Sequence, residues 1–401
     1  MFRSVRTFAA AVLPLFVIVA MPSTARAAYI CVNPGGTNGC LATIQAAINA
    51  AGAYDTVQVA AGTYHEKLVI GQFVPMTING AGAENTIVDG TGVGDPSAAV
   101  IKLSDFSATN LPITITDLTV RGGYRGIHTG RFAVVQLRRL VVRDNGIGSG
   151  AGVFNNASFV TISDSVIRDN KADDAAFGCD GSGGSGGGIA TLCGGGSYTI
   201  VNTAVVNNTA RAGGGAVFVN GQQTILNSTF SGNVATDPKG LGGAIMSFAD
   251  GIFLSNDTFA SNTTTPGGGA VFFASAAATV KATIFDNKDG GNCGIGGPVS
   301  SGGYNVSSDS TCPFAAAGDL VNTDARLFRL ADNGGETLTH ALKGDSPALN
   351  LVPVTLCGPP ATDQRGRERP AGKQCDAGAF ERHARDLWHS DHDDRDDRDK
   401  R

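Results

Sequence analysis

The chain has 401 residues and a formal net charge of −5, with 30 Lys and Arg against 35 Asp and Glu. This acidic balance excludes nucleic-acid binding as a function, because phosphate backbones attract basic surfaces. Ser, Thr, Asn and Gly, the last with 56 residues, are expected to dominate the surface. Such a surface suits sugars or another protein as partners.

The N-terminal segment 1–27 has the pattern of a secretory signal peptide. Arg3 and Arg6 precede an apolar run over positions 8–21, and the small residues Ala25 and Ala27 follow it. This pattern predicts cleavage before Ala28 and export to the extracellular space, cell surface or periplasm. The run is too short to span a bilayer and no second one follows, so no membrane helix is expected.

The segment after the signal predicts one short helix and then strands. Residues 43–51 place apolar side chains on one helical stripe, which would cover the open end of a repeat structure. Glu66 is expected at a strand edge. Bursts rich in Val, Ile and Thr predict strands at residues 56–59, 66–70, 76–78 and 86–88.

Three stretches of this region, residues 44–51, 61–70 and 77–90, resemble the opening of the pectin lyase-like superfamily, which includes pectin methylesterases. The resemblance implies a right-handed parallel β-helix with carbohydrate-active relatives, and it covers a folding cap. The segments that carry the catalytic groups of methylesterases have no good counterpart here. Polygalacturonases use an Asp pair and a Gly-His-Gly turn; Asp173-Asp174 is such a pair, but the turn does not occur.

A short phrase that ends in Asn recurs at a nearly regular spacing through the middle of the chain, and a Gly-rich step follows each of the first five copies. This period predicts a solenoid of short strands and turns, here an all-β, right-handed parallel β-helix over residues 28–305. Stacked about 4.8 Å apart, the repeated side chains would form a hydrogen-bonded ladder at a bend. Its members are Asn145, Asn170, Asn208, Asn233, Asn262 and Asn287.

Aligned repeats place three arginines in one column. Arg121, Arg143 and Arg168 recur at the spacing of the repeat, and Asp144 and Asp169 occupy the next column. Forked guanidinium groups match carboxylates, so the column is a candidate cradle for an acidic polysaccharide. The predicted ligand-binding residues are Arg121, Arg125, Arg143, Asp144, Arg168 and Asp169. The alternative is a surface ladder of salt bridges.

A catalytic interpretation uses part of the same region. A polysaccharide lyase needs a base and a group that neutralises the substrate carboxylate. The candidates are Arg121, Tyr124, His128 and Arg143, where His128 is the one His of the central coils. No cofactor is expected for a binding protein, whereas a lyase could use Ca²⁺ held by Asp.

The eight cysteines fall into four pairs of near neighbours, none with the two-residue spacing of zinc or redox motifs. This arrangement predicts four local disulfides, formed in an oxidising compartment, and no metal site. The expected pairs are Cys31–Cys40, Cys179–Cys193, Cys293–Cys312 and Cys357–Cys375.

The repeat ends after Ser307, and four motifs then follow in order within residues 319–381. They are Asn-Gly-Gly-x-Thr-x-Thr-His-Ala-Leu, Gly-x-Ser-Pro-Ala, Asp-Gln-Arg-Gly-x-x-Arg-Pro and Cys-Asp-x-Gly-Ala-Phe-Glu. They resemble the choice-of-anchor Q domain of exported bacterial β-helix proteins. The resemblance implies a bacterial surface or secreted protein whose anchoring device varies among relatives, and it implies no catalytic activity. Residues 306–381 are expected to form a small domain, linked by the disulfide that the cysteine spacing predicts. Residues 382–401 predict a disordered charged tail, whose His389 and His392 could bind a cation weakly.

The expected function is an exported bacterial binding or adhesion component, directed toward polysaccharide or a cell-surface glycan and acting as a monomer. The alternative is a polysaccharide lyase, or another carbohydrate-active enzyme, that acts on uronate glycans. Whether the chain is catalytic stays open at the level of the sequence.

Overall fold

The computed structural model describes residues 27–71, 74–105, 112–173, 184–191, 195–248, 251–264, 268–274, 277–287, 289–358 and 360–386. Several predicted features lie outside these residues: the signal peptide up to residue 26, the pair Cys179 and Cys193, Asp174, and the tail from residue 387 onward.

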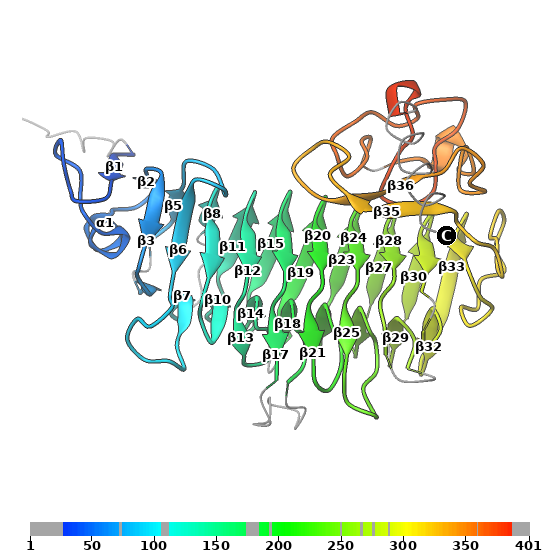
Figure 1. Ribbon diagram of the computed structural model, residues 1–401, viewed down its shortest axis with the longest axis horizontal. Helices are drawn as coiled ribbons and strands as arrows, with labels where there is room; N and C mark the ends of the chain where they lie inside the picture. Colours follow the sequence, from blue (N-terminus) through cyan, green and yellow to red (C-terminus); the bar gives the residue numbers. More distant parts are fainter. Residues whose placement is uncertain are drawn as a thin grey trace, which may run out of the picture.

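The chain winds into a right-handed parallel β-helix of about 10 turns, as predicted (Figure 1). Each full turn contributes one strand to each of three long parallel sheets.

Sheet 1 contains β1 (Tyr29–Val32), β2 (Thr56–Val59), β5 (Met76–Asn79), β8 (Pro112–Thr116), β11 (Val134–Arg138), β15 (Phe159–Ser163), β19 (Ser197–Val201), β23 (Gln223–Leu226), β27 (Ile252–Ser255), β30 (Ala278–Lys281) and β33 (Val299–Gly303). Sheet 2 contains β3 (Gly62–Tyr64), β6 (Thr86–Asp89), β9 (Thr119–Arg121), β12 (Val141–Arg143), β16 (Val166–Arg168), β20 (Ala204–Val206), β24 (Thr229–Ser231), β28 (Thr258–Ala260), β31 (Ile284–Asp286) and β34 (Val306–Ser307).

Sheet 3 contains β4 (Leu68–Ile70), β7 (Ala99–Leu103), β10 (Arg125–Thr129), β14 (Val153–Asn155), β18 (Ile189–Thr191), β22 (Val217–Val219), β26 (Ile245–Ser247), β29 (Val271–Phe273) and β32 (Cys293–Ile295). A short fourth sheet lies between sheets 2 and 3 in the chain; it contains β13 (Gly146–Ile147), β17 (Lys171–Ala172), β21 (Thr209–Ala210) and β25 (Val234–Ala235).

The core fills the inside of the helix because side chains alternate along each strand. In sheet 2 the inward residues Val120, Val142 and Ile167 are fully buried. Later turns use aromatic side chains instead: the ring of Phe259 stacks between Phe230 and Phe285, with centroids 4.8 and 5.1 Å apart. The outward residues of the same strands are therefore free to form a surface.

The predicted helix covers the N-terminal end as α1 (Ile44–Ala50). The hydroxyl of Thr43 accepts from Ala46 N at 3.2 Å, as expected of an N-cap. Glu66 also caps this helix, because its two carboxylate oxygens accept from Ile44 N at 2.9 Å and Gln45 N at 3.0 Å. The prediction that Glu66 begins a strand was wrong: β4 begins at Leu68, and the carboxylate satisfies free helical N–H groups instead.

The asparagine ladder forms as predicted. Within the six-member series each buried side chain donates to the carbonyl oxygen of the next one, for example Asn208 Nδ2 to Asn233 Oδ1 at 3.1 Å and Asn233 Nδ2 to Asn262 Oδ1 at 2.9 Å. Sequence reasoning missed the last member, Asn292, whose Oδ1 accepts from Asn287 Nδ2 at 3.0 Å.

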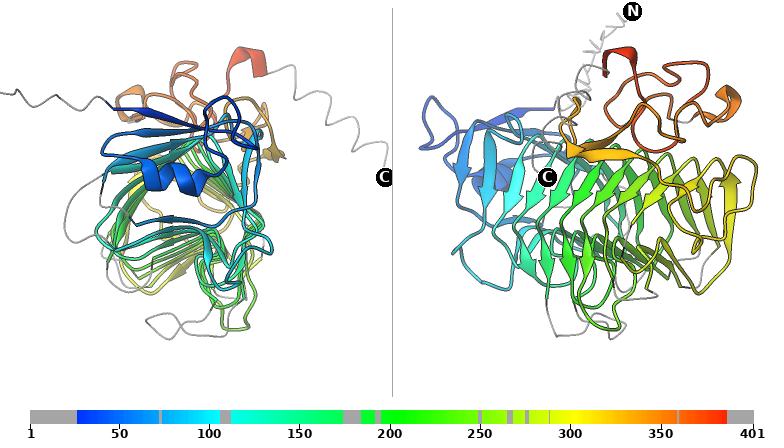
Figure 2. Two further views of the ribbon diagram at one scale, coloured as in Figure 1. Left: turned by 90° about the vertical axis from the view of Figure 1, so that its left-hand side faces the viewer. Right: turned by 45° about the vertical axis from the view of Figure 1, so that its right-hand side comes forward.

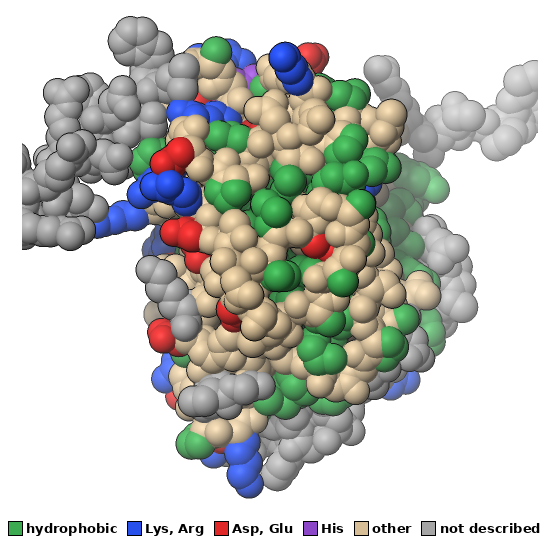
Figure 3. Space-filling view, turned by 90° about the vertical axis from the view of Figure 1, so that its right-hand side faces the viewer, with side chains coloured by type: hydrophobic (Ala, Val, Ile, Leu, Met, Phe, Trp, Pro, Cys, Tyr) green, Lys and Arg blue, Asp and Glu red, His purple; other side chains and the backbone are tan. Residues whose placement is uncertain are grey.

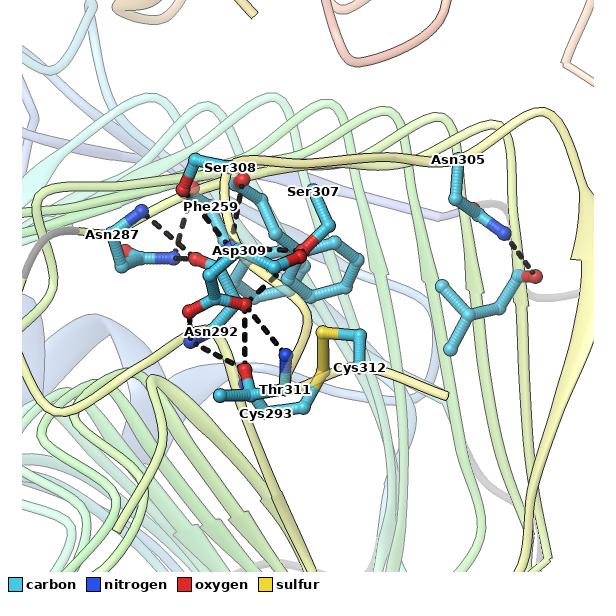
Figure 4. The surroundings of a disulfide bond; sticks show 12 residues. Phe259, Asn287, Asn292, Cys293, Asn305, Ser307, Ser308, Asp309, Thr311 and Cys312 are labelled. Carbon is cyan, nitrogen blue, oxygen red and sulfur yellow. Dashed lines mark hydrogen bonds between the residues drawn. A yellow bond between two sulfur atoms is a disulfide. The ribbon is translucent and has the colours of Figure 1, made fainter. Parts of the chain in front are cut away.

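The ladder ends at a small polar cluster beside a disulfide (Figure 4). Asn292 N donates to Asp309 Oδ2 at 2.9 Å, and the Asn292 side chain donates to Ser307 and Ser308 at 3.0 Å. The adjacent Cys293–Cys312 disulfide joins the last strand of sheet 3 to the closing segment. Figure 3 looks at this end of the molecule, where hydrophobic side chains are spread among polar ones with few charges.

Three of the four predicted disulfides lie within the described residues, and all three form: Cys31–Cys40, Cys293–Cys312 and Cys357–Cys375. No helix of the described residues is long and apolar enough to cross a membrane.

The C-terminal domain after the last coil has little regular structure. It contains the antiparallel strands β35 (Leu327–Ala331) and β36 (Thr339–Leu342) and the short 3₁₀ helices η1 (Val354–Leu356) and η2 (Ala384–Asp386). It does not extend away from the solenoid. Figures 1 and 2 show it lying along the later turns.

Candidate functional site

The arginine column exists as predicted, on the outward face of sheet 2. In the register of the parallel strands, Arg143 of β12 lies between Arg121 of β9 and Arg168 of β16. Strand alternation explains this placement, because the preceding residue of each strand points into the core. Asp89 of β6 continues the same row on the N-terminal side.

Each guanidinium of the column is paired with a carboxylate. Arg121 contacts Asp89 at 2.8 Å, whereas Arg143 pairs with Asp144 and Arg168 with Asp169 in their own coils. Asp144 and Asp169 follow their strands directly and have φ values of 52° and 56°, which turns their side chains back beside the arginines. The column is therefore a ladder of ion pairs with its positive charge compensated.

A groove of about 530 Å³ runs beside this column. Its floor is a second row of outward residues on sheet 2, each two positions before the arginine row in its strand. The residues of this row, neighbours in register, are Ile87, Thr119, Val141 and Val166. Three strand spacings give this floor a length of roughly 14 Å. Arg143 and Arg168 line the groove, and Glu84 lines it near the N-terminal end.

The wall of the groove opposite the solenoid belongs to the C-terminal domain. The segment between β35 and β36 contributes Asp332, Gly335, Glu336, Thr337 and Leu338, and we call residues 332–338 the roof loop. The groove is thus built from two parts of the chain that are far apart in the sequence, and it exists only when the C-terminal domain is docked on the solenoid.

The outward face of sheet 2 changes character where the domain docks. In the arginine row, the positions after Arg168 are Val206, Ser231 and Ala260, and all three are buried although they point out of the solenoid. Small uncharged residues allow close approach of a second layer, whereas arginines would hold it away. The column therefore ends where the docking surface begins.

Hydrogen bonds between buried side chains fix the docked position. Gln364 Oε1 accepts from Thr229 Oγ1 at 2.6 Å, and Gln364 Nε2 donates to Thr337 Oγ1 of the roof loop at 2.8 Å. His340 Nδ1 donates to the Phe328 carbonyl at 2.8 Å, so its Nε2 accepts from the Ser231 hydroxyl at 2.9 Å. Burial lowers the pKa of His340, which favours this neutral form.

Tyr124, Arg125 and His128 do not join the arginine column. They follow the turn after β9, and Arg125 and His128 belong to β10 of sheet 3. The Arg125 guanidinium lies over the Phe154 ring at 4.3 Å and donates from Nε to the Ser149 carbonyl at 2.7 Å. His128 meets the same ring edge-on, with centroids 4.9 Å apart. The six predicted ligand-binding residues therefore divide between two faces, with Arg125 apart from the other five.

Exposed ion pairs should contribute little to folding, so we expect Arg143→Ala to change the free energy of unfolding by about 0–1 kcal/mol. Its partner Asp144 has half of its side chain in solvent and stays hydrated when the arginine is removed. Chemical denaturation of the mature protein measures this directly. A loss well above about 1 kcal/mol would show that the column is part of the scaffold.

His128 should make the solenoid sensitive to acid. Burial, followed by the charges of Arg125 and Lys102, lowers its pKa from 6.5 to about 4. The folded state thus resists protonation, so the stability that neutral His128 contributes is complete above pH 6.5 and is lost as the pH falls toward 4. Between about pH 7 and about pH 4.5, wild type should lose roughly 2 kcal/mol more than His128→Gln in denaturant unfolding. Parallel pH profiles of the two proteins would contradict this.

Sequence reasoning missed the groove itself. Glu84, Asp332 and Glu336 line it, yet none belongs to the arginine pattern. The four-motif resemblance did single out the Asn-Gly-Gly-x-Thr segment that forms most of the roof loop, but it gave no position for it. Within the described ranges, no three His, Cys, Asp or Glu side chains gather closely enough to hold a metal ion. Asp173 of the predicted acidic pair contacts Lys171 at 2.7 Å, while Asp174 lies outside those ranges.

Comparison with known proteins gives no family for the chain. No protein-family model matches it, and no curated protein does. Among solved structures, a pectin methylesterase from carrot is 11% identical with a TM-score of 0.44, covering 68% of this chain and 88% of its own. An alginate lyase from Paenibacillus sp. is 18% identical with a TM-score of 0.42, covering 68% and 99%. A pectin methylesterase from Erwinia chrysanthemi is 11% identical with a TM-score of 0.38, covering 65% and 80%.

Proposed function

We propose that the protein is an exported, non-catalytic polysaccharide-binding protein and that a glycan chain lies in the groove between sheet 2 and the roof loop. The observation that carries the proposal is the lining of this groove. A half-buried floor of Ile87, Val141 and Val166, with Thr119 among them, lies between walls of charged and hydroxyl side chains. Sugar rings present apolar C–H faces to such a floor and hydroxyl groups to such walls. The three disulfides support an oxidising compartment outside the cytoplasm.

An extended binding surface suits adhesion, since a long chain can contact several turns of a solenoid at once. The floor residues of the groove lie on rigid parallel strands, so little conformational order has to be gained there on binding.

The lyase alternative has less support from the geometry. Elimination needs a base and a carboxylate-neutralising group on either side of one sugar. Arg143 lies on sheet 2 and His128 on sheet 3, so these two candidates do not face a common ligand. Arg121 and Arg143 are both held by carboxylates. Elimination creates a conjugated double bond, so a dose-dependent rise in ultraviolet absorbance with polygalacturonate or alginate would establish the lyase instead.

A blocked groove tests the binding proposal. Val141→Trp would place a large ring on the groove floor, whereas Val134→Trp makes the same change at a half-buried outward position of sheet 1. We expect affinity electrophoresis in gels of neutral, acidic and amino-containing polysaccharides to show retardation of wild type and Val134→Trp by at least one glycan, and none of Val141→Trp. If both variants were retarded equally, the polysaccharide would bind outside the groove. If the wild type were not retarded by any of the polysaccharides, the proposed polysaccharide-binding function would be wrong.

A further inference from the structure

We infer that the groove selects a positively charged amino-sugar chain, such as a glucosamine polymer, over a uronate chain; this rests on the proposed glycan-binding function. This ligand charge is opposite to the one that the arginine column suggests in the sequence. The reason is that the arginines near the groove are already paired with carboxylates, whereas the acidic side chains of its lining have no direct ion-pair partner in the described part of the chain.

The positive charges are compensated. Arg143 and Arg168 both line the groove, but each is paired with the Asp that follows it in the chain. Arg139, which lies near Glu336, donates from Nε to Asp117 Oδ1 at 2.6 Å and is held in a bidentate pair. An incoming carboxylate would have to displace one of these partners and would meet its charge at close range.

The negative charges of the groove lack direct ion-pair partners within the described ranges, although Arg139 lies near Glu336. Glu84, Asp332 and Glu336 line the groove and are exposed, and none of the three takes part in an ion pair among the described residues. Glu84 belongs to the solenoid, whereas Asp332 and Glu336 belong to the roof loop, so docking of the domain brings the carboxylates to one groove. With its two arginines neutralised by Asp144 and Asp169, the groove carries an excess of negative charge.

The spread of these carboxylates favours an extended cation over a single ion. They line one groove, whose floor is roughly 14 Å long, but they do not gather into a group that could hold a metal. An amino-sugar chain matches this arrangement, since its rings carry ammonium groups at intervals and present C–H faces to the Ile and Val floor. Ammonium groups near exposed carboxylates gain affinity that falls as salt rises.

The test compares three oligosaccharides of equal length by calorimetry in mildly acidic, low-salt buffer: glucosamine oligomers, N-acetylglucosamine oligomers and oligogalacturonate. N-acetylation removes the charge and keeps the ring. We expect the glucosamine oligomers to bind tightest, and added salt to weaken their binding alone. The double variant Glu84→Gln/Glu336→Gln should bind them about five- to tenfold more weakly, while Glu368→Gln, an exposed glutamate of the C-terminal domain away from the groove lining, should match wild type.

The outcomes separate the two proposals. Equal binding of the acetylated and free-amine oligomers, or tighter binding of oligogalacturonate, would overturn the charge preference and leave the glycan-binding function standing. An unchanged affinity of the double variant would also overturn it. Oligolysine that binds as tightly as the glucosamine oligomers would refute selection of a sugar. If no polysaccharide binds the wild type in either assay, the proposed function itself fails.

Discussion

Asn233→Ala should destabilise the solenoid by at least about 2 kcal/mol, although the substitution removes only a small polar group. Asn233 Oδ1 accepts from the backbone N and the Nδ2 of Asn208, at 3.0 and 3.1 Å, and its Nδ2 donates to Val205 O at 2.8 Å and to Asn262 Oδ1 at 2.9 Å. All of these groups are buried. Without the amide, two buried donors of Asn208 lose their acceptor, and each unsatisfied buried polar group costs about 1–3 kcal/mol. Asn262 Oδ1 is affected less, because it keeps the hydrogen bond from Asn233 N at 3.0 Å.

The effect should be specific to the ladder. Asn85→Ala removes the same side chain at an exposed position, where its Nδ2 donates to Ala81 O at 3.2 Å, and should cost less than about 1 kcal/mol. Thermal and denaturant unfolding monitored by far-ultraviolet circular dichroism would measure both variants. Similar losses for the two would mean that the ladder is not a main source of stability.

Arg369→Ala should release the C-terminal domain from the solenoid. Arg369 is fully buried and donates to Glu381 Oε2 at 3.0 Å, to the Asp376 carbonyl at 2.9 Å and to the Gly378 carbonyl at 2.6 Å. Gly378 and Ala379 attach the domain to the solenoid. Gly378 N donates to Ala282 O at 2.8 Å, and Ala379 N donates to Thr258 Oγ1 at 3.0 Å. Removal of one partner from a buried ion pair costs about 3–5 kcal/mol, because the other charge stays buried with neither a partner nor water to compensate it.

The loss of stability in Arg369→Ala should depend on pH, because it depends on whether Glu381 is charged. Burial, followed by the charge of Asp376, raises the pKa of Glu381 from 4.5 to about 7. Since the folded-state pKa is raised, the folded state favours protonated Glu381 below pH 7, and this stabilisation decreases as the pH rises from 4.5 to 7. We therefore expect Arg369→Ala to be less harmful near pH 5 than near pH 8, where an unpaired carboxylate would stay buried.

A matched substitution in the same domain serves as the control. Arg326 pairs with Asp345 at 2.7 Å, but half or more of each side chain is in solvent, so Arg326→Ala should cost about 0–1 kcal/mol. Limited proteolysis should cut Arg369→Ala within residues 319–386 while the solenoid resists, and glycan binding should be lost with the roof loop. A domain that stays resistant to protease at both pH values would contradict the prediction.

The solenoid could be predicted from the amino-acid sequence, because the pattern that specifies it is local and periodic. The Asn phrase fixes a turn at one position of every coil, and stacking then requires each of these side chains to bond to its neighbours. The same register predicted the column of Arg121, Arg143 and Arg168, and near-neighbour spacing predicted the three described disulfides. Residues outside the repeat period were missed: Asn292 joins the ladder only five residues after Asn287, and Glu66 caps a helix from another part of the first coil.

The surroundings of the arginine column depend on long-range contacts and could not be predicted from the sequence. The ion pairs with Asp144 and Asp169 depend on left-handed turn residues that swing each carboxylate back beside its arginine. The roof loop reaches Val141 and Val166 because the domain that carries it docks on Val206, Ser231 and Ala260, small outward residues whose burial no local pattern reveals. Contacts between segments so far apart in the sequence depend on how two surfaces fit together. The period of a repeat specifies the surface of the solenoid, but it does not specify which other part of the chain will cover that surface.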